Sequence, residues 1–173
     1  SIKIKHNKNV IMVFATHSHD DRAGGLDFYR KKGIKTYSGK LTDEILKKKN
    51  EKRAEFILPN DTIFNVGKYK FEAYYPGKGH APDNIVVWFE KEKILYGGCF
   101  VKSTEAKDLG YLGDTNVEEW EKWIKKVQAK FKNPKYIIPG HDGWADIKSL
   151  DHTMKMVHDY NLSSTTSQKS GQK

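Results

Sequence analysis

The stretch "VIMVFATHSHDDRAGG", from Val10 to Gly25, decides the fold expected for this chain of 173 residues. Its first half is apolar and rich in β-branched residues, which predicts a buried strand over residues 8–16. Directly after that strand, His17, His19 and Asp21 occupy alternate positions, so in an extended or tightly turned segment their side chains share one side. Imidazole and carboxylate groups that converge in this way favour zinc or a neighbouring first-row metal.

Three further potential ligands each follow a strand-like segment and a glycine. They are His80 in "YYPGKGHAPDN", Cys99 in "ILYGGCFVKS" and His141 in "YIIPGHDGW". Glycine there permits a tight turn that directs the next side chain off the edge of a sheet. Four histidines, one aspartate and one cysteine exceed the needs of one four-coordinate zinc ion and suit two. Two zinc ions generate a nucleophile near neutral pH, so the residues by themselves indicate a two-zinc hydrolase.

The remaining pattern predicts an α/β fold with a mixed sheet. Helices are expected over 23–33, 41–50, 115–131 and 146–160, and strands over 34–37, 61–67, 69–77, 84–90, 93–98 and 134–139. Thr42 is a candidate N-cap, and Thr115 with Glu118 matches a capping box. The ordered domain is expected to cover residues 1–161, and the polar residues 162–173 are expected to form a disordered tail.

The net charge of +9 leaves other classes of protein to consider. A basic chain can favour nucleic acid, but the lysines are spread over many segments and no nucleic-acid-binding motif accompanies them, which favours a solvated surface. No apolar run has the length of a membrane span. His6, His152 and His158 lie in segments without glycine, and they are expected to be surface histidines.

The motifs "THSHDDRAGG", "GKGHAPDNIVVWF", "GGCFVKS", "AKDLGY" and "PGHDGW" carry a strong resemblance to the class B metallo-β-lactamases, and among them to flavobacterial enzymes. The resemblance implies an αββα sandwich and two zinc ions. His17, His19 and His80 would bind the first ion, and Asp21, Cys99 and His141 the second. It further implies hydrolysis of the β-lactam amide bond of penicillins, cephalosporins and carbapenems by a zinc-bound hydroxide, with no covalent enzyme intermediate.

By the same resemblance, Lys102 would bind the substrate carboxylate, with His141 beside it, and Asp21 would orient the nucleophile and assist proton transfer. Asn84 would support catalysis from an outer position. Other hydrolases of the same fold carry an extra ligand where Arg22 stands and a bridging aspartate where Cys99 stands, which disfavours that alternative. Tyr111 replaces an asparagine of many members, which leaves its role and the substrate spectrum open.

Members of the family carry a longer segment ahead of the first metal motif than this chain does. We therefore expect a partial, N-terminally truncated sequence that lacks much of the first half of the sandwich, and an inactive zinc-binding fragment is the alternative that follows. The resemblance also implies a periplasmic location, a small-molecule β-lactam as the only partner, no nucleic acid, no membrane association and a monomeric state.

Overall fold

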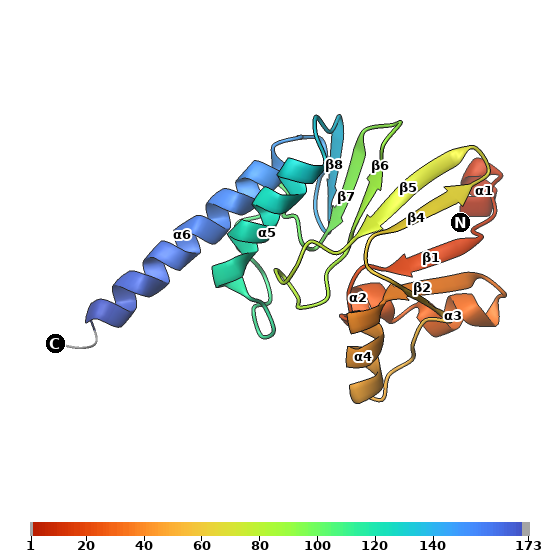
Figure 1. Cartoon of the computed structure of the whole chain (residues 1–173), viewed down its shortest axis with the longest axis horizontal. Helices are drawn as coiled ribbons and strands as arrows, with labels where there is room; N and C mark the ends of the chain where they lie inside the picture. The colour runs from red at the N-terminus through yellow and green to blue at the C-terminus, as the bar shows by residue number, and fades with distance from the viewer. Residues whose placement is uncertain (1, 171–173) are drawn as a thin grey trace. The chain divides into compact units, whose positions relative to one another are not determined.

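The structure is a computed structural model that describes residues 2–170. The chain divides into two compact units, Ser1–Asn60 and Asp61–Lys173, which are described separately below. Figure 1 labels the helices and strands of both units. Among the described residues, no helix combines the length and the apolar character that a membrane span requires.

The first unit is built on a three-stranded parallel sheet in the order β1-β2-β3. Its elements are α1 (Ile2–His6), β1 (Met12–Ala15), α2 (Asp20–Ala23), α3 (Leu26–Lys31), β2 (Lys35–Gly39), α4 (Lys40–Lys48) and β3 (Phe56–Leu58). Parallel neighbours need crossover connections, and here α2 with α3, and then α4, supply them. A small core of Ala15, Ala23, Leu26 and Leu46 joins the sheet to these helices.

One face of this small sheet carries a ladder of three aromatic rings. Phe14 pairs in register with Tyr37, and Tyr37 pairs with Phe56. The ring centroids of both pairs are 5.1 Å apart, and the planes are nearly parallel. Cross-strand aromatic pairs stabilise a sheet beyond their buried area, so the ladder fixes the register that places the end of β1.

The second unit holds a five-stranded sheet in the order β4-β5-β6-β7-β8, covered by two long helices. Its elements are β4 (Thr62–Val66), β5 (Tyr69–Tyr74), β6 (Val86–Phe89), β7 (Ile94–Gly98), α5 (Val117–Lys130), β8 (Tyr136–Pro139) and α6 (Ser149–Ser170). The first four strands pair antiparallel, and β8 lies parallel to β7. Helices α5 and α6 lie side by side, as Figure 1 shows.

The core of this unit forms where the apolar stripe of α5 meets the sheet. Trp120, Ile124 and Val127 are fully buried, and they join Val86, Trp88, Leu95 and Ile137 from the strands and Leu150 and Val157 from α6. The sequence predicted a helix over residues 115–131, and α5 confirms it. The strands predicted over 84–90 and 93–98 and the mixed sheet are confirmed as well.

Three local predictions differ from the structure. Helix α4 follows Gly39 directly as its N-cap, so Thr42 lies inside the helix, fully buried. Asn116, and not Thr115, caps α5, because its side chain accepts a hydrogen bond from the Glu119 amide. Helix α6 continues to Ser170, past the residue at which composition predicts disorder, and the end of the predicted tail, 171–173, lies outside the described residues.

Candidate metal centre

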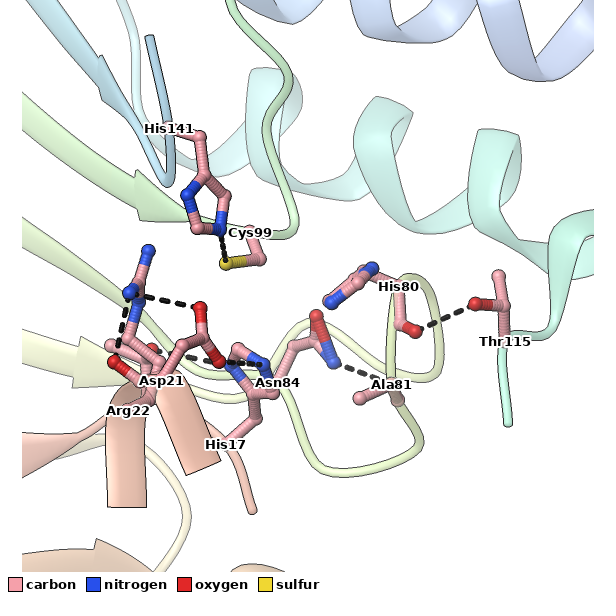
Figure 2. A network of polar contacts seen from close by, with 10 residues as sticks. His17, Asp21, Arg22, His80, Ala81, Asn84, Cys99, Thr115 and His141 are labelled. Atoms are coloured by element: carbon pink, nitrogen blue, oxygen red, sulfur yellow. Dashed lines mark hydrogen bonds and ion pairs between the residues drawn. The ribbon is translucent and has the colours of Figure 1, made fainter. Parts of the chain in front are cut away.

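His17, His19 and Asp21 form a compact cluster in the first unit. The chain leaves β1 at Ala15, bends through residues 16–19 and enters α2 at Asp20. One ligand atom from each of the three side chains lies within 4.8 Å of the others. His17 Nε2 is 3.9 Å from the Asp21 carboxylate, a relationship that Figure 2 marks. The convergence therefore comes from the bend that leads into α2 rather than from alternation along a strand.

Neighbouring groups fix the orientation of these ligands. Thr16 Oγ1 lies 3.4 Å from Nδ1 of the fully buried His17, which leaves Nε2 turned toward Asp21. Arg22 Nη1 lies 3.0 Å from the Asp21 carboxylate and donates to the Asp21 carbonyl oxygen at the same distance. The guanidinium thus fixes the orientation of the Asp21 carboxylate. Residues that hydrogen-bond to metal ligands commonly do this in protein metal sites.

In the second unit, Cys99 lies between two histidines. Its Sγ atom is 3.3 Å from Nε2 of His141, and Figure 2 shows the two side chains pointing toward one another. The ligand atoms of Cys99 and His80 lie within 4.8 Å of one another. Cys99 follows β7 and His141 follows β8, so neighbouring parallel strands end at one edge of the sheet and present both ligands there.

Two glycines make this closeness possible, for a reason other than turn geometry. A Cβ atom on Gly140 would lie 2.6 Å from both the backbone nitrogen and the Sγ atom of Cys99. A Cβ atom on Gly79 would lie 2.7 Å from the ring of Phe100. Neither distance leaves room for a side chain. Glycine is required at both positions because the backbone at Gly140 packs directly against Cys99, and the backbone at Gly79 against Phe100.

The loop that carries His80 is held through three successive carbonyl oxygens. The Thr115 hydroxyl donates to the carbonyl of His80 itself, at 2.7 Å. The Asn84 amide donates to the next carbonyl, on Ala81, and the Tyr75 hydroxyl donates to the one after, on Pro82, at 2.8 Å. Figure 2 shows the first two of these bonds. The backbone behind His80 is therefore fixed by side chains from three different segments.

Of the three side chains that hold this loop, Tyr75 is titratable, and its pKa is raised. Burial of the ring raises the pKa of its hydroxyl above the usual value, and the carboxylates of Asp83 and Glu119 raise it further. The phenol therefore stays protonated, and remains a donor to Pro82, to higher pH than an exposed tyrosine would.

A cavity of about 320 Å³ opens beside the Cys99–His141 pair. Lys102 and Asp108 also line it. The ammonium group of Lys102 lies 5.7 Å from the ring centroid of Trp120, and the residue is 9% exposed. A positive group at the wall of a cavity beside potential metal ligands is suited to hold an anionic part of a ligand.

Two loops around this cavity are tied together at Gly143. The Ser103 hydroxyl donates to the Gly143 carbonyl oxygen at 2.6 Å, and the Gly143 amide donates to the Glu105 carboxylate at 3.2 Å. Glu105 also receives local support, because its own amide donates to the Ser103 hydroxyl oxygen. The loop after Lys102 therefore holds the loop after His141 by both hydrogen-bonding groups of one residue.

The residues singled out by sequence occupy different environments in the structure. His17, His19 and Asp21 lie together in one unit, and His80, Cys99, Lys102 and His141 belong to the other. Asn84 is buried beneath the His80 loop and supports its backbone. Tyr111 is 65% exposed. Sequence reasoning missed Tyr75, Ser103 and Glu105 and gave Thr115 only a capping role. The roles of all four depend on long-range contacts that no spacing rule reveals.

Of the three histidines expected at the surface, two are exposed and one is partly buried. His6 and His158 are exposed, and His158 lies 3.3 Å from Glu121. His152 is partly buried on α6, and its Nε2 lies 3.1 Å from the Ala106 carbonyl oxygen. His152 is therefore less exposed than the other two, because the Ala106 carbonyl oxygen contacts its ring.

The donor types that these side chains offer are those of zinc sites in proteins. Imidazole nitrogen, carboxylate oxygen and thiolate sulfur are the ligands that zinc takes in proteins, and thiolate disfavours harder cations such as magnesium or calcium. Within the first unit the donors are two imidazoles and a carboxylate, and within the second they are two imidazoles and a thiol. Neither set contains the all-oxygen shell that a hard cation prefers.

Comparison with known proteins agrees with this chemistry. Residues 3–141 match the family model described as the metallo-beta-lactamase superfamily. A metallo-beta-lactamase type 2 of Elizabethkingia meningoseptica is 50% identical over 156 residues, which are 90% of this chain and 63% of that protein. Metallo-beta-lactamase IND-1 of Chryseobacterium indologenes is 46% identical over 91% of this chain and 66% of its own length. The chain thus spans about two thirds of these relatives.

Solved structures give the same result. The crystal structure of metallo-beta-lactamase IND-7 superposes with a TM-score of 0.86 at 46% identity, covering 91% of this chain and 72% of the other. A metallo-beta-lactamase from Pontibacter korlensis gives a TM-score of 0.87 at 32% identity, covering 91% of this chain and 74% of the other. The similarity therefore covers the overall path of the chain as well as the short motifs.

Proposed function

Because this chain belongs to the metallo-beta-lactamase superfamily, we propose that it hydrolyses the amide bond of β-lactam antibiotics with two zinc ions. The substrates are penicillins, cephalosporins and carbapenems, and no covalent enzyme intermediate forms. The observation that carries the proposal lies within the second unit. There Lys102, Cys99 and His141 line one cavity, so a basic residue and proposed metal ligands border the same space.

We assign His17, His19 and His80 to a first zinc ion and Asp21, Cys99 and His141 to a second. The assignment rests on donor chemistry and on the similarity to zinc enzymes of the same family. Bound zinc lowers the pKa of coordinated water, so that it supplies hydroxide at neutral pH, and it polarises an amide carbonyl.

The chain's own residues bind and orient the substrate around that chemistry. Lys102 holds the carboxylate of the β-lactam by a charge-assisted hydrogen bond, with His141 beside it in the same cavity wall. Asp21, held by Arg22, orients the attacking water and assists transfer of its proton to the β-lactam nitrogen, which leaves the carbonyl carbon as the C–N bond breaks. Asn84 acts indirectly, because its amide fixes the backbone next to His80.

The identity of two residues favours this substrate class over other zinc hydrolases of the same fold. Arg22 occupies the place of an additional ligand in those relatives, and here it binds Asp21 instead of offering a donor to a metal. Cys99 occupies the place of a bridging carboxylate.

We further propose that the protein acts as a monomer in the periplasm, with antibiotic as its only partner and no role for nucleic acid or membrane.

The test is hydrolysis by the purified chain. Zinc per chain is measured first, and then ring opening of a penicillin, a cephalosporin and a carbapenem is followed before chelation, after chelation and after zinc is restored. The expected result is two zinc ions and activity that chelation removes and zinc returns. A chain that binds two zinc ions but opens none of the three rings would overturn the proposed reaction. A thioester substrate serves as the comparison that detects another hydrolase activity.

A further inference from the structure

The backbone of Lys102 is held by a buried side chain from the last helix. Thr153 lies on α6 and is fully buried. Its Oγ1 atom accepts a hydrogen bond from the Lys102 amide at 2.8 Å, and it also lies 3.3 Å from the Lys102 carbonyl oxygen. The two residues are 51 positions apart in the sequence. No short motif around Lys102 therefore contains this partner.

The single proton of the Thr153 hydroxyl is already committed. Oγ1 donates to the carbonyl oxygen of Ser149 at 2.6 Å, one turn earlier in α6. A threonine inside a helix commonly makes that bond and nothing else. Here the bond orients the lone pairs of Oγ1 away from the helix, toward the Lys102 amide. The buried hydroxyl thus donates one hydrogen bond, to Ser149, and accepts one, from the Lys102 amide.

A second helix holds the other end of the same residue. The Lys102 ammonium lies 5.7 Å from the ring centroid of Trp120 on α5. That indole is fixed in turn, because its Nε1 donates to the Phe100 carbonyl oxygen at 3.1 Å. On α6, His152 contacts the Ala106 carbonyl oxygen, four residues after Lys102. Both ends of the lysine are therefore set by groups that do not line the cavity.

We infer that Thr153 is a positioning residue that sets Lys102 for the carboxylate of the substrate. The inference rests on the proposed function. Because α6 holds the Lys102 backbone before the substrate arrives, the lysine loses less conformational entropy when its ammonium binds the anion. Removing the acceptor oxygen leaves a buried amide without a partner and frees the Lys102 backbone to move. Zinc binding is not expected to change, since the hydrogen bonds given above for Thr153 join it to Lys102 and Ser149 and not to a proposed ligand.

The experiment compares three variants of the full zinc-loaded chain. Thr153→Val keeps the shape but removes the acceptor, Thr153→Ser keeps the hydroxyl, and Met154→Leu alters the neighbouring core position without touching Lys102. Zinc content, the hydrogen-exchange rate of the Lys102 amide, kcat and KM are measured for each. KM is determined for a cephalosporin acid and for its methyl ester, which lacks the anion.

For Thr153→Val we expect exchange of the Lys102 amide to be at least about tenfold faster, and KM for the acid to rise about tenfold with kcat nearly unchanged. KM for the ester, zinc content and the Met154→Leu control should stay near the parent values. Thr153→Ser should restore both the exchange rate and KM. Equal rises of KM for acid and ester would overturn the inference, because they indicate general loosening.

Failure of the proposed function looks different. If the parent chain opens no β-lactam ring, the dissociation constants of the acid and the ester are measured instead, through the chemical shift of the Lys102 amide. A roughly tenfold weaker affinity of Thr153→Val for the acid alone would still support the inference. Unchanged exchange of the Lys102 amide in Thr153→Val would overturn it whatever the enzyme hydrolyses.

Discussion

Cys99 Sγ lies 3.3 Å from His141 Nε2 because the strands that precede the two residues are parallel neighbours. Gly98, at the end of β7, pairs in register with Pro139, at the end of β8. Cys99 is the first residue after β7, and His141 is the second residue after β8. The distance between the two side chains is therefore a property of the sheet and not of a flexible loop, which favours a preformed site.

The thiol of Cys99 is expected to be essential for holding the second metal ion. In Cys99→Ser, the hydroxyl that replaces the thiol does not ionise near neutral pH, so the variant loses its soft anionic ligand. We expect the zinc bound per chain to fall from two toward one at low free zinc, and turnover to fall at least about a hundredfold. Full zinc content and unchanged turnover would contradict the assignment. Zinc titration with a colorimetric chelator gives the measurement.

Gly140 is expected to tolerate no side chain. In Gly140→Ala the new methyl would lie 2.6 Å from Cys99 N and Sγ, so the His141 loop must move outward. Overpacking of this kind costs about 1–3 kcal/mol, and here it separates two proposed ligands. We expect a lower melting temperature and weaker binding of the second zinc ion. Gly25→Ala is the matched control, because its methyl would come no closer than 3.4 Å to the Tyr29 ring.

The sequence located the proposed metal-binding side chains, but it did not locate the residues that support them. Ligand residues stand next to strand ends, and strand ends are visible in the alternation of apolar and polar residues. His80, Cys99 and His141 were all placed on that basis, and the structure brings Cys99 near both histidines. The glycine before each ligand was identified as well, although its role at Gly140 is close approach and not a turn.

Thr115 shows why the supports were not predictable. Its position three residues before Glu118 matches a local capping pattern, and local patterns are all that spacing can test. In the structure its hydroxyl instead donates to the His80 carbonyl, 35 residues away. Asn116 takes over the cap as a result. A long-range contact thus outweighs a local preference, and such contacts are decided only by how β5, β6 and α5 pack.

Ser103 is expected to keep the His141 loop in place. Ser103→Ala removes the hydroxyl that donates to the Gly143 carbonyl and accepts from the Glu105 amide. The loss of these two bonds is expected to destabilise the fold by about 1–2 kcal/mol and to weaken the second zinc site more than the first. Urea unfolding and zinc titration measure the two effects.

Ser163→Ala serves as the control for this change. Its hydroxyl donates to the Tyr160 carbonyl on an exposed turn of α6, far along the chain from the ligands. An equal loss of zinc affinity in both variants would mean that the Ser103 bonds do not act on the site.

Tyr75 is expected to make the stability of the second unit depend on pH in the alkaline range. Its pKa is raised above the usual value by burial and by Asp83 and Glu119, so the folded state favours the protonated phenol. The stability from this group is complete below the pKa of the unfolded chain, about 10, and is lost as pH rises through the higher folded value. The same ionisation removes the donor to Pro82 and so loosens the loop behind His80.

Tyr75→Phe separates these contributions. At pH 8 the variant should be less stable by about 1 kcal/mol, because one hydrogen bond to Pro82 is lost. Between pH 10 and 11 the parent should lose stability more steeply than the variant, so the gap narrows as pH rises. Tyr69→Phe, which alters an exposed ring, should keep the parent slope. Urea unfolding at both pH values tests this. If the free energy of unfolding falls equally with pH in the parent and in Tyr75→Phe, ionisation of Tyr75 does not contribute to the loss of stability.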